Sequence, residues 1–369
     1  MRLLILTQKV DINDDILGFF HGWIAEFAKN CESVLVVCLY EGQHNLPGNV
    51  RVLSLGKEKF IRSNSYHSNI IRRLVSIYRF YSYIWQERQN YDSVFVHMNH
   101  EYVLLGGWLW RLLGKKIGLW YTHKSVNFKL RIAEKMVDVI FTASKESFRL
   151  PSKKLKVLGH GIDIKKFTLL NNFSIRKISA NAEFNRVNII TIGRISPIKD
   201  YETLIAAAEI LQKENFKFNL QIIGGPATEN DKEYLIKLKK SVQEKGLGEE
   251  IKFIGSIPNK NIANYYQSAD LFVNLSHTGS LDKVVLEAMA SSLPVLTCNE
   301  ALIPIISEYK GLLFFKKKDS VELAEKIKSL YLLESGIKDK MINFFQEMVA
   351  RDHNLETLAV KILECYQKI

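Results

Sequence analysis

The sequence lacks several features that would place it outside the class of ordinary globular proteins. No stretch of its 369 residues approaches the roughly 18 consecutive apolar residues of a membrane-spanning helix. The opening MRLLILTQ has an apolar run of four residues, which is too short for a signal-peptide core and predicts a first strand. We therefore expect a cytoplasmic protein.

Cysteine is scarce as well, with four residues in the whole chain. Cys31, Cys38, Cys298 and Cys365 are scattered and show neither a CxxC motif nor the spacing of metal ligands. This pattern is typical of reduced thiols in a cytosolic protein, and it predicts no structural metal.

Positive charge, in contrast, is in excess, with a formal net charge of +12. Such a balance attracts nucleic acid, anionic membrane surfaces or phosphorylated small molecules. No helix-turn-helix, zinc-finger or RNP-like pattern accompanies the charge, so we expect no nucleic-acid partner. A membrane surface and a phosphorylated ligand are the anions that remain.

The segment 69–88 (NIIRRLVSIYRFYSYIWQER) mixes positive and aromatic residues most closely. Its four arginines, Arg72, Arg73, Arg79 and Arg88, alternate with Ile, Leu, Tyr, Phe and Trp. This mixture suits a helix that lies on an anionic lipid surface, on the inner face of a membrane. The alternative is an aromatic helix that packs against its own sheet and extends its arginines to water.

The order of strand-like and helix-like segments predicts an α/β protein of two domains. In the first half, seven short runs rich in β-branched and aromatic residues alternate with longer amphipathic stretches, which predicts parallel strands joined by crossover helices. The runs are LLILTQ, SVLVVCLY, VRVLSL, SVFVHM, KIGLWYTH, DVIFTAS and KVLGHG. The pattern restarts at VNIITIGR, after a polar segment at 171–186 that we interpret as a linker.

Two such units in tandem predict a pair of doubly wound, Rossmann-like domains that face each other across a cleft. We assign residues 1–170 to the first domain and residues 187–350 to the second. In open parallel sheets, ligands bind beyond the carboxyl ends of the strands. Motifs at strand-to-helix junctions are therefore the candidates for a site.

The most informative junction is 276–294 (SHTGSLDKVVLEAMASSLP), where a small and polar loop leads into an apolar helix. A loop of this kind presents backbone N–H groups and a positive dipole end to a ligand. Glu287 follows about one turn into the helix, among apolar neighbours. Burying this carboxylate is costly unless it is hydrogen-bonded, as a ribose diol would do. Alternatively, the segment is an ordinary strand–loop–helix unit whose Glu287 reaches solvent.

A second junction, 191–201 (TIGRISPIKDY), places Arg194 after a strand and Lys199 just before a helix. A cation at a helix N-terminus opposes the helix dipole, and a bound anion would remove that conflict. Arg binds two phosphate oxygens as a fork, and Lys supplies a compact charge. Alternatively, Lys199 is a solvated surface residue and Asp200 is the N-cap of the helix.

Four further residues stand at strand ends of the first half. Gly18 either lets a phosphate or sugar approach the backbone or marks a helix start. His97, His100 and His123 end two of the strand-like runs, where adjacent polar residues at one sheet edge can build a site. A single histidine at such a place is more often a structural residue with its hydrogen bonds satisfied.

Together these elements resemble the retaining glycosyltransferases of the GT-B fold, most closely glycosyltransferase family 4. YTH, DVIFTAS, HGIDIKKF, IGRISPIKDYETLIAAAEIL, IIGGP, IKFIGSI and LEAMASSLPVLT occur in that family's order and approximate spacing. The resemblance implies two Rossmann-like domains. It also implies that a last helix, within about 351–369, crosses back onto the first domain.

The resemblance assigns roles to residues of both domains. It implies that Arg194 and Lys199 hold the diphosphate of the donor, and that Glu287 binds the ribose hydroxyls of its nucleotide. His123 matches the histidine near the reacting carbon of the donor sugar.

On the acceptor side, Gly18 matches a glycine of the loop where phosphate and acceptor meet, although Leu17 replaces the first of the family's two adjacent glycines. His97 and His100 fall where acceptor-contacting groups are usual.

One departure from the family concerns the donor loop. The family has a first acid eight positions before Glu287, where this chain has Gly279, and its Gly-Phe-Gly loop is replaced by residues 280–283 (SLDK). Gly279, Ser280, Asp282 and Lys283 therefore line the expected donor site. Asp282 either takes over the missing acid's contact with sugar hydroxyls or caps the helix that follows.

The resemblance implies a metal-independent, retaining transfer of a sugar from a nucleoside diphosphate sugar to a hydroxyl of a saccharide or lipid-linked acceptor. Cell-envelope polysaccharide or glycolipid synthesis is the expected setting, with no cofactor besides the donor. Two alternatives stay open: a nucleotide-sugar epimerase of the same fold, and a non-catalytic sugar-nucleotide-binding partner of a transferase.

Overall fold

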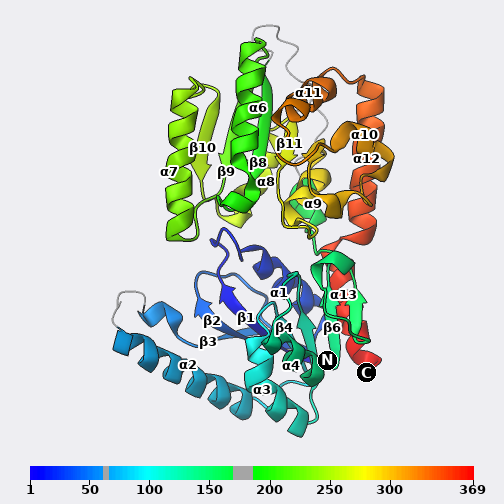
Figure 1. The fold of residues 1–369 in the computed structure, drawn as a ribbon. Coiled ribbons are helices and arrows are strands. Elements are labelled where there is room, and N and C mark those ends of the chain that lie inside the picture. The colour runs from blue at the N-terminus through cyan, green and yellow to red at the C-terminus, as the bar shows by residue number, and fades with distance from the viewer. Residues whose placement is uncertain (61–65, 169–185) are drawn as a thin grey trace. The chain divides into compact units, whose positions relative to one another are not determined.

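The computed structural model describes residues 1–60, 66–168 and 186–369, which form two compact units (Figure 1). The first unit comprises Met1–Gly161, Pro258–Lys260 and His353–Ile369, and the second comprises Ile162–Ile257 and Asn261–Asp352. The second unit thus begins before the boundary at residue 170 that the sequence predicts. The predicted linker at 171–186 lies outside the described residues except for Arg186.

The first unit is built on a sheet of seven parallel strands in the order β3-β2-β1-β4-β5-β6-β7. The strands are β1 (Arg2–Val10), β2 (Ser33–Glu41), β3 (Val50–Ser54), β4 (Ser93–His97), β5 (Lys116–Trp120), β6 (Val139–Thr142) and β7 (Leu155–Val157). The central strands are nearly continuous apolar runs because helices cover both faces of the sheet.

Two layers of helices enclose this sheet. The helices are α1 (Phe19–Asn30), α2 (Tyr66–Gln86), α3 (Glu101–Leu112), α4 (Phe128–Met136) and α13 (Leu355–Gln367). One apolar core joins α1 and α13 to one face of the sheet, and a second joins α2, α3 and α4 to the other. The final helix thus packs on the first sheet, as the sequence predicts.

The second unit has five parallel strands in the order β10-β9-β8-β11-β12. The strands are β8 (Val187–Ile192), β9 (Phe218–Ile223), β10 (Ile251–Gly255), β11 (Leu271–Asn274) and β12 (Val295–Thr297). The helices are α5 (Ile164–Thr168), α6 (Tyr201–Lys213), α7 (Glu229–Glu244), α8 (Ile262–Gln267), α9 (Lys283–Ala290), α10 (Lys310–Leu313), α11 (Ser320–Tyr331) and α12 (Ser335–Asp352). The predicted alternation of strands and helices is confirmed in both halves.

Local sequence explains how these helices begin and pack. In α6, the buried residues Tyr201, Leu204, Ala208 and Leu211 recur every three or four positions and form the apolar stripe that faces the core. At the start of α7, the Thr228 hydroxyl accepts from the N–H of Asp231, and the Asp231 carboxylate accepts from the N–H of Thr228. This reciprocal capping box fixes the first turn.

The strand order reverses once in each sheet. In the first sheet the reversal lies between β1 and β4, and in the second it lies between β8 and β11. From such a pair of parallel strands, the two chain connections leave toward opposite sides of the sheet. This opens a crevice at the carboxyl ends of the two strands, where ligands of doubly wound sheets bind. The loops after β1, β4, β8 and β11 are therefore the places to look for a site.

Helix α2 has an inner side that is tied to the fold. Phe80 and Ile84 are buried, and the Arg79 guanidinium donates to the carbonyl oxygen of Leu55 at 3.3 Å. The prediction that the helix packs against its own sheet is correct for this side. Arg79, however, is only partly exposed, because its guanidinium is held by the Leu55 carbonyl.

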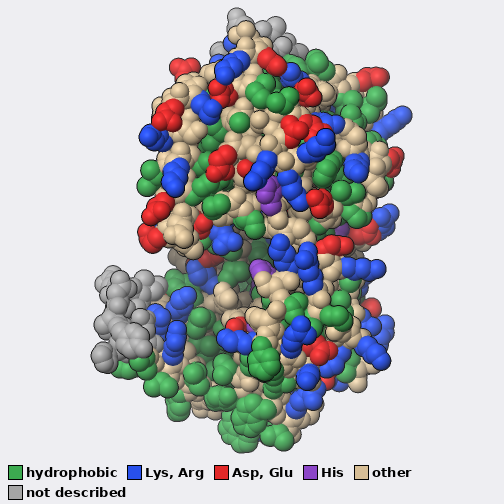
Figure 2. All heavy atoms as spheres, in the orientation of Figure 1, with side chains coloured by type: hydrophobic (Ala, Val, Ile, Leu, Met, Phe, Trp, Pro, Cys, Tyr) green, Lys and Arg blue, Asp and Glu red, His purple; other side chains and the backbone are tan. Residues whose placement is uncertain are grey.

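The other side of α2 exposes large apolar residues. Leu74, Tyr78 and Trp85 are 62%, 74% and 52% exposed, and Trp108 and Leu112 of the neighbouring α3 are exposed as well. Figure 2 shows hydrophobic side chains gathered over this lower part of the first unit. None of the helices in the described part of the chain combines the length and the apolar character that spanning a bilayer requires.

The C-terminal helix is fixed to the first sheet through Tyr366. Its hydroxyl donates to the carbonyl oxygen of Val94 at 2.7 Å, and the Lys116 ammonium donates to the carbonyl oxygen of Tyr366 at 2.7 Å. Gly118 of β5 makes room for this ring: a Cβ at Gly118 would lie 2.8 Å from Phe141 and closer still to the Tyr366 hydroxyl.

We predict that Gly118→Ala lowers the free energy of unfolding by about 1–3 kcal/mol, because the added methyl overpacks the core between β5 and α13. Urea denaturation followed by circular dichroism measures the change. Gly22→Ala in α1 is the control, since its Cβ would approach only Leu355, at 3.8 Å. Equal stabilities of the two variants would contradict the packing described here.

Candidate functional site

The loops after β8 and β11 meet at the switch point of the second sheet. Lys199, which ends a short 3-10 turn (Pro197–Lys199), extends its ammonium toward the β11 loop. It donates to the Ser276 hydroxyl at 3.1 Å and forms an ion pair with Asp282 at 3.5 Å. Only 17% of the Lys199 side chain is exposed. The alternative of a solvated surface residue is therefore wrong.

Asp282 occupies the N-cap position of α9, but its side chain accepts no hydrogen bond from the helix backbone. Its carboxylate instead accepts from the Asn274 side-chain amide at 3.0 Å and from the Thr278 hydroxyl at 3.5 Å, in addition to the ion pair with Lys199. The capping interpretation of Asp282 is thus wrong, because the carboxylate is drawn to the cation across the crevice.

A network of hydroxyls and amides fixes the β11 loop beneath these charges. Asn274 accepts from the Thr297 hydroxyl at 3.0 Å, and Asn299 donates to the carbonyl oxygen of Ser280 at 2.8 Å. Gly279, at the turn of the loop, has a φ of 62°. This left-handed conformation favours glycine and explains in part why no acid stands there.

Glu287 lies on the buried side of α9, with 5% of its side chain exposed. Its Oε1 accepts from the Lys283 ammonium at 2.9 Å, and its Oε2 accepts from the Tyr266 hydroxyl at 3.0 Å. Burial raises the pKa of Tyr266, and the adjacent carboxylate adds to the effect, so the phenol remains a donor. The alternative in which Glu287 reaches solvent is therefore wrong.

Lys283 and Tyr266 compensate the burial of the Glu287 carboxylate without any ligand. The chain itself satisfies one lone pair on each oxygen of Glu287, so the carboxylate needs no ligand to compensate for its burial. A carboxylate has about four acceptor sites, which leaves capacity for the two hydroxyls of a diol.

Lys166 of α5 brings a further cation to this carboxylate. Its side chain is half-buried, with the ammonium 5.3 Å from the centre of the Phe167 ring. Burial lowers the pKa of Lys166 to about 8, and the negative charge of Glu287 partly opposes that shift. Lys283 adds to the lowering as a second cation nearby.

Arg194 stands just after the end of β8, and its side chain is exposed. Its side chain makes no hydrogen bond or ion pair with any residue in the described ranges, in contrast to Lys199. The backbone beside it is tightly packed, since Gly224 of the IIGGP turn has a φ of 136° and a Cβ there would overlap the carbonyl oxygen of Gly193. The glycine turn therefore serves the close approach of the β8 and β9 loops.

Asp200 does not cap α6 with its side chain, although it occupies the N-cap position. Its backbone is left-handed, with a φ of 45°, and its carboxylate accepts from the Thr203 hydroxyl at 2.8 Å. The His277 ring lies 3.3 Å from the same carboxylate oxygen. The alternative that Asp200 is the N-cap is thus correct for its position, but its carboxylate caps no backbone N–H because this conformation directs it to side chains.

In the first unit, two of the predicted residues lie at the switch point between β1 and β4. His97 is buried, stacks on Phe20 with ring centres 3.8 Å apart, and its Nδ1 lies 3.3 Å from the Thr7 hydroxyl. Gly18 immediately precedes α1, and a Cβ at Gly18 would overlap the carbonyl oxygen of Asp14. In the structure, Gly18 is thus a helix start, and His97 has structural partners.

The other two histidines differ in exposure. His100 is buried at the N-terminus of α3, where burial lowers its pKa and keeps the ring neutral near pH 7. His123 is exposed after β5, and its Nδ1 accepts from the N–H of Ser125 at 3.1 Å. Of the three histidines, only His123 presents its side chain openly to a ligand.

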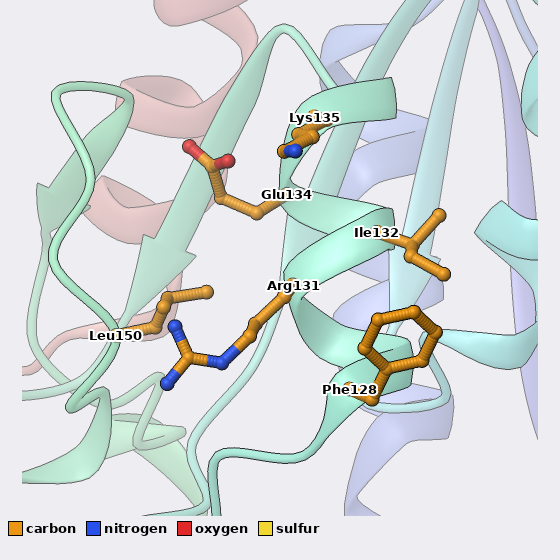
Figure 3. A pocket seen from close by; sticks show the side chains of 6 residues that line it. All are labelled: Phe128, Arg131, Ile132, Glu134, Lys135 and Leu150. Atoms are coloured by element: carbon orange, nitrogen blue, oxygen red, sulfur yellow. The ribbon is translucent and has the colours of Figure 1, made fainter.

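A surface pocket of the first unit lies elsewhere, along α4 (Figure 3). Phe128, Arg131, Ile132, Glu134 and Lys135 line it from the helix, and Leu150 closes one side. None of these residues belongs to the predicted site. Within the ranges that the structure describes, no three His, Cys, Asp or Glu side chains group as ligands for a metal ion.

The structure therefore brings Lys199, Asp282, Lys283 and Glu287 together within the second unit and leaves Arg194 exposed beside them. Sequence reasoning missed Tyr266, Asn274 and Lys166, which contact or face the predicted charges. Asn274 alone carried a signal, as a polar residue that ends an otherwise apolar strand.

Comparison with known proteins finds a family model that matches part of the chain. Residues 174–347 match the family model described as "Glycosyl transferases group 1". The chain is 26% identical over 211 residues to the mannosylfructose-phosphate synthase of Agrobacterium fabrum, covering 52% of this chain and 46% of the relative. It is 28% identical over 165 residues to the amylovoran biosynthesis glycosyltransferase AmsK of Erwinia amylovora, covering 43% of this chain and 37% of the relative. The matches span less than half the length of either relative.

Solved structures match over the whole chain. Anabaena HepE in complex with UDP superposes with a TM-score of 0.73 at 18% identity and covers 100% of both chains. Sucrose-phosphate synthase from Thermosynechococcus elongatus gives a TM-score of 0.74 at 16% identity and covers 100% of this chain and 99% of its own. At these identities the likeness establishes the fold, which is GT-B, as the sequence predicts.

We predict that the wild-type protein gains stability relative to Lys166→Met as the pH rises from about 8 toward 10.5. Below that window the folded state must keep a charged ammonium in a partly buried place. Above it the proton is lost and the cost disappears, because the unfolded chain binds the proton more tightly. Urea denaturation of both proteins at pH 7 and pH 9 measures the difference.

The control for removing a lysine is Lys213→Met, whose side chain is 71% exposed at the end of α6. Parallel curves for wild type and Lys166→Met across this range would show that Lys166 is not perturbed by its surroundings.

Proposed function

We propose that this protein transfers a sugar from a nucleoside diphosphate sugar to an acceptor hydroxyl, because residues 174–347 match the group 1 glycosyl transferase model and the chain has the GT-B fold. The observation that carries the proposal is the meeting of Lys199 and the β11 loop at the switch point of the second sheet. Several similar structures were solved with UDP or UDP sugars, which supports a donor of this class.

In this proposal, Lys199 and Arg194 bind the donor's diphosphate. Departure of the nucleoside diphosphate places negative charge on its β-phosphate, and a preorganised cation stabilises that charge most in a site screened from water. Lys199 is held in place by Ser276 and Asp282, while the exposed Arg194 is free to fold onto the phosphate. Glu287 binds the ribose hydroxyls with the lone pairs that Tyr266 and Lys283 leave unused.

We infer that the transfer retains the configuration at the anomeric carbon. Asp282 is occupied by Lys199, and Glu287 lies inside α9 against Tyr266, so neither carboxylate is placed as an attacking nucleophile. A front-face route, in which the leaving phosphate accepts the proton of the acceptor hydroxyl, fits these constraints. Retention also rests on the resemblance to family 4, as does the assignment of His123 to the neighbourhood of the reacting carbon.

The acceptor that we propose is lipid-linked, in cell-envelope polysaccharide or glycolipid synthesis. Among similar proteins are an alpha-monoglucosyldiacylglycerol synthase of Streptococcus pneumoniae and WaaG, a glycosyltransferase involved in lipopolysaccharide biosynthesis. The outer face of α2 supports the same proposal, because its exposed Leu74, Tyr78 and Trp85 lie beside arginines. Apolar side chains that enter the interface, flanked by cations that attract anionic headgroups, are typical of peripheral membrane binding.

We predict that Arg194→Ala lowers turnover by about two to three decades, because Arg194 donates to the developing charge on the β-phosphate and the loss of one such donor costs about 2.7–4 kcal/mol of barrier. Thermal-shift screening with UDP, GDP and ADP and their sugars first identifies the donor base, since binding raises the stability of the folded state. Release of the nucleoside diphosphate then measures turnover.

Lys240→Ala, on the exposed side of α7, is the matched control for the loss of a cation and keeps wild-type turnover. Wild-type turnover in Arg194→Ala would remove the diphosphate assignment. Conversion of the donor sugar without release would favour the epimerase alternative. Binding without any turnover would favour a non-catalytic partner.

We predict that Leu74→Asp weakens binding to vesicles of phosphatidylglycerol and phosphatidylcholine by about tenfold, because a charge replaces an apolar side chain at the lipid interface. Vesicle flotation measures the bound fraction. Ile236→Asp in the second unit is the control, since Ile236 is comparably exposed (67%) but lies on α7. Wild-type protein that floats with neither anionic nor neutral vesicles would defeat the membrane proposal.

A further inference from the structure

Two consecutive residues, Asp282 and Lys283, form ion pairs with Lys199 and Glu287, the two residues that bind the donor in the proposed function. Asp282 forms the ion pair with Lys199, the proposed diphosphate cation, and Lys283 forms the ion pair with Glu287, the proposed ribose acid. Residues 282 and 283 therefore supply one charge of each sign and compensate the site internally.

The helix that these residues begin gains little from them. Asp282 makes no side-chain capping hydrogen bond, and Lys283 stands in the first turn of α9, where a cation opposes the helix dipole. The pair of Lys283 with Glu287 also has the less favourable order, since the acid lies on the C-terminal side of the lysine. Local stability of α9 thus does not account for the two residues. Asp282 instead pairs with Lys199 across the crevice, and Lys283 compensates the buried charge of Glu287 in the same helix.

The contact of Asp282 with Lys199 is held from both sides. Asn274 donates to the same carboxylate oxygen that faces Lys199, and Ser276 accepts from the Lys199 ammonium. The two charged side chains are 14% and 17% exposed, so solvent screens their attraction less than on an open surface. A diphosphate that binds Lys199 must therefore compete with an anion that is already in position.

We propose that Asp282 is an internal competitor for Lys199, which a donor diphosphate displaces when it binds. This inference rests on the proposed function and deepens it. Asp282 lowers the affinity of the site for the diphosphate group shared by the donor and by the nucleoside diphosphate product. After displacement, Asn274 and Thr278 retain the carboxylate, so the loop keeps its conformation while Lys199 changes partner.

Isothermal titration calorimetry with inorganic pyrophosphate and with UDP tests this directly. Asp282→Asn keeps the size of the side chain and an oxygen for Asn274 but removes the negative charge. We expect it to bind pyrophosphate about tenfold more tightly than wild type, the scale of one partly screened charge contact. In a Lys199→Ala background, Asp282→Asn should change the affinity by less than twofold, because the competed cation is absent.

Glu229→Gln is the control for the change in net charge, since it removes one negative charge from the exposed start of α7. Unchanged or weaker pyrophosphate binding by Asp282→Asn would overturn the inference. The inference also fails if the gain persists without Lys199, if Glu229→Gln shows an equal gain, or if no variant binds pyrophosphate.

Failure of the proposed function gives a different result. In that case the order of pyrophosphate affinities holds, but no UDP, GDP or ADP sugar is turned over. Circular dichroism melts of each variant check that it is folded, and Asp282→Ser, which also removes the charge at an N-cap position, replaces Asp282→Asn if that variant is not.

Discussion

The carboxyl ends of parallel strands all meet one edge of a sheet, and this constraint governs where chemistry can occur in both units. In the second unit it brings together residues that are distant in sequence, such as Lys199 after β8 and Ser276 after β11. The reversal of strand order between these two strands leaves their loops side by side without a crossover to fill the space. Every charge in the candidate site depends on that geometry.

Apart from the exposed Arg194, the charges of the site are paired within the protein rather than left to solvent. A buried carboxylate is costly unless hydrogen bonds and an opposite charge compensate it, and Glu287 has both in Tyr266 and Lys283. Lys166, in contrast, is compensated only in part, since burial lowers its pKa to about 8 despite the opposing attraction of Glu287. The site is therefore arranged before any ligand arrives, and a ligand exchanges partners instead of creating them.

The sequence predicted the strands, the helices and their order because these follow from apolar periodicity and from residues that end helices. It also predicted which junctions carry charge. It did not predict the direction of side chains at those junctions: Asp200 and Asp282 stand at N-cap positions, yet both carboxylates turn to side chains instead of the helix backbone.

The partners of Glu287 were equally hidden from sequence, since Tyr266 lies 21 residues away and reaches it only through the packing of α8 on α9. From the expected burial of Glu287, the sequence indicated that its carboxylate accepts hydrogen bonds from a ligand, whereas Tyr266 and Lys283 already donate to it. The roles of Arg194, Lys199 and His123 in a reaction remain predictions that rest on the resemblance and on the geometry of each unit.

The position of α13 has a consequence for how the protein is made. Leu358, Ile362 and Tyr366 complete the core on the α1 face of the first sheet, although they are translated after the second unit. Until then, β1 and α1 stand with an apolar face uncovered, while the whole second unit is synthesised in between. Chains that lack α13 are thus expected to misfold in the first unit, whose strands are translated long before this helix.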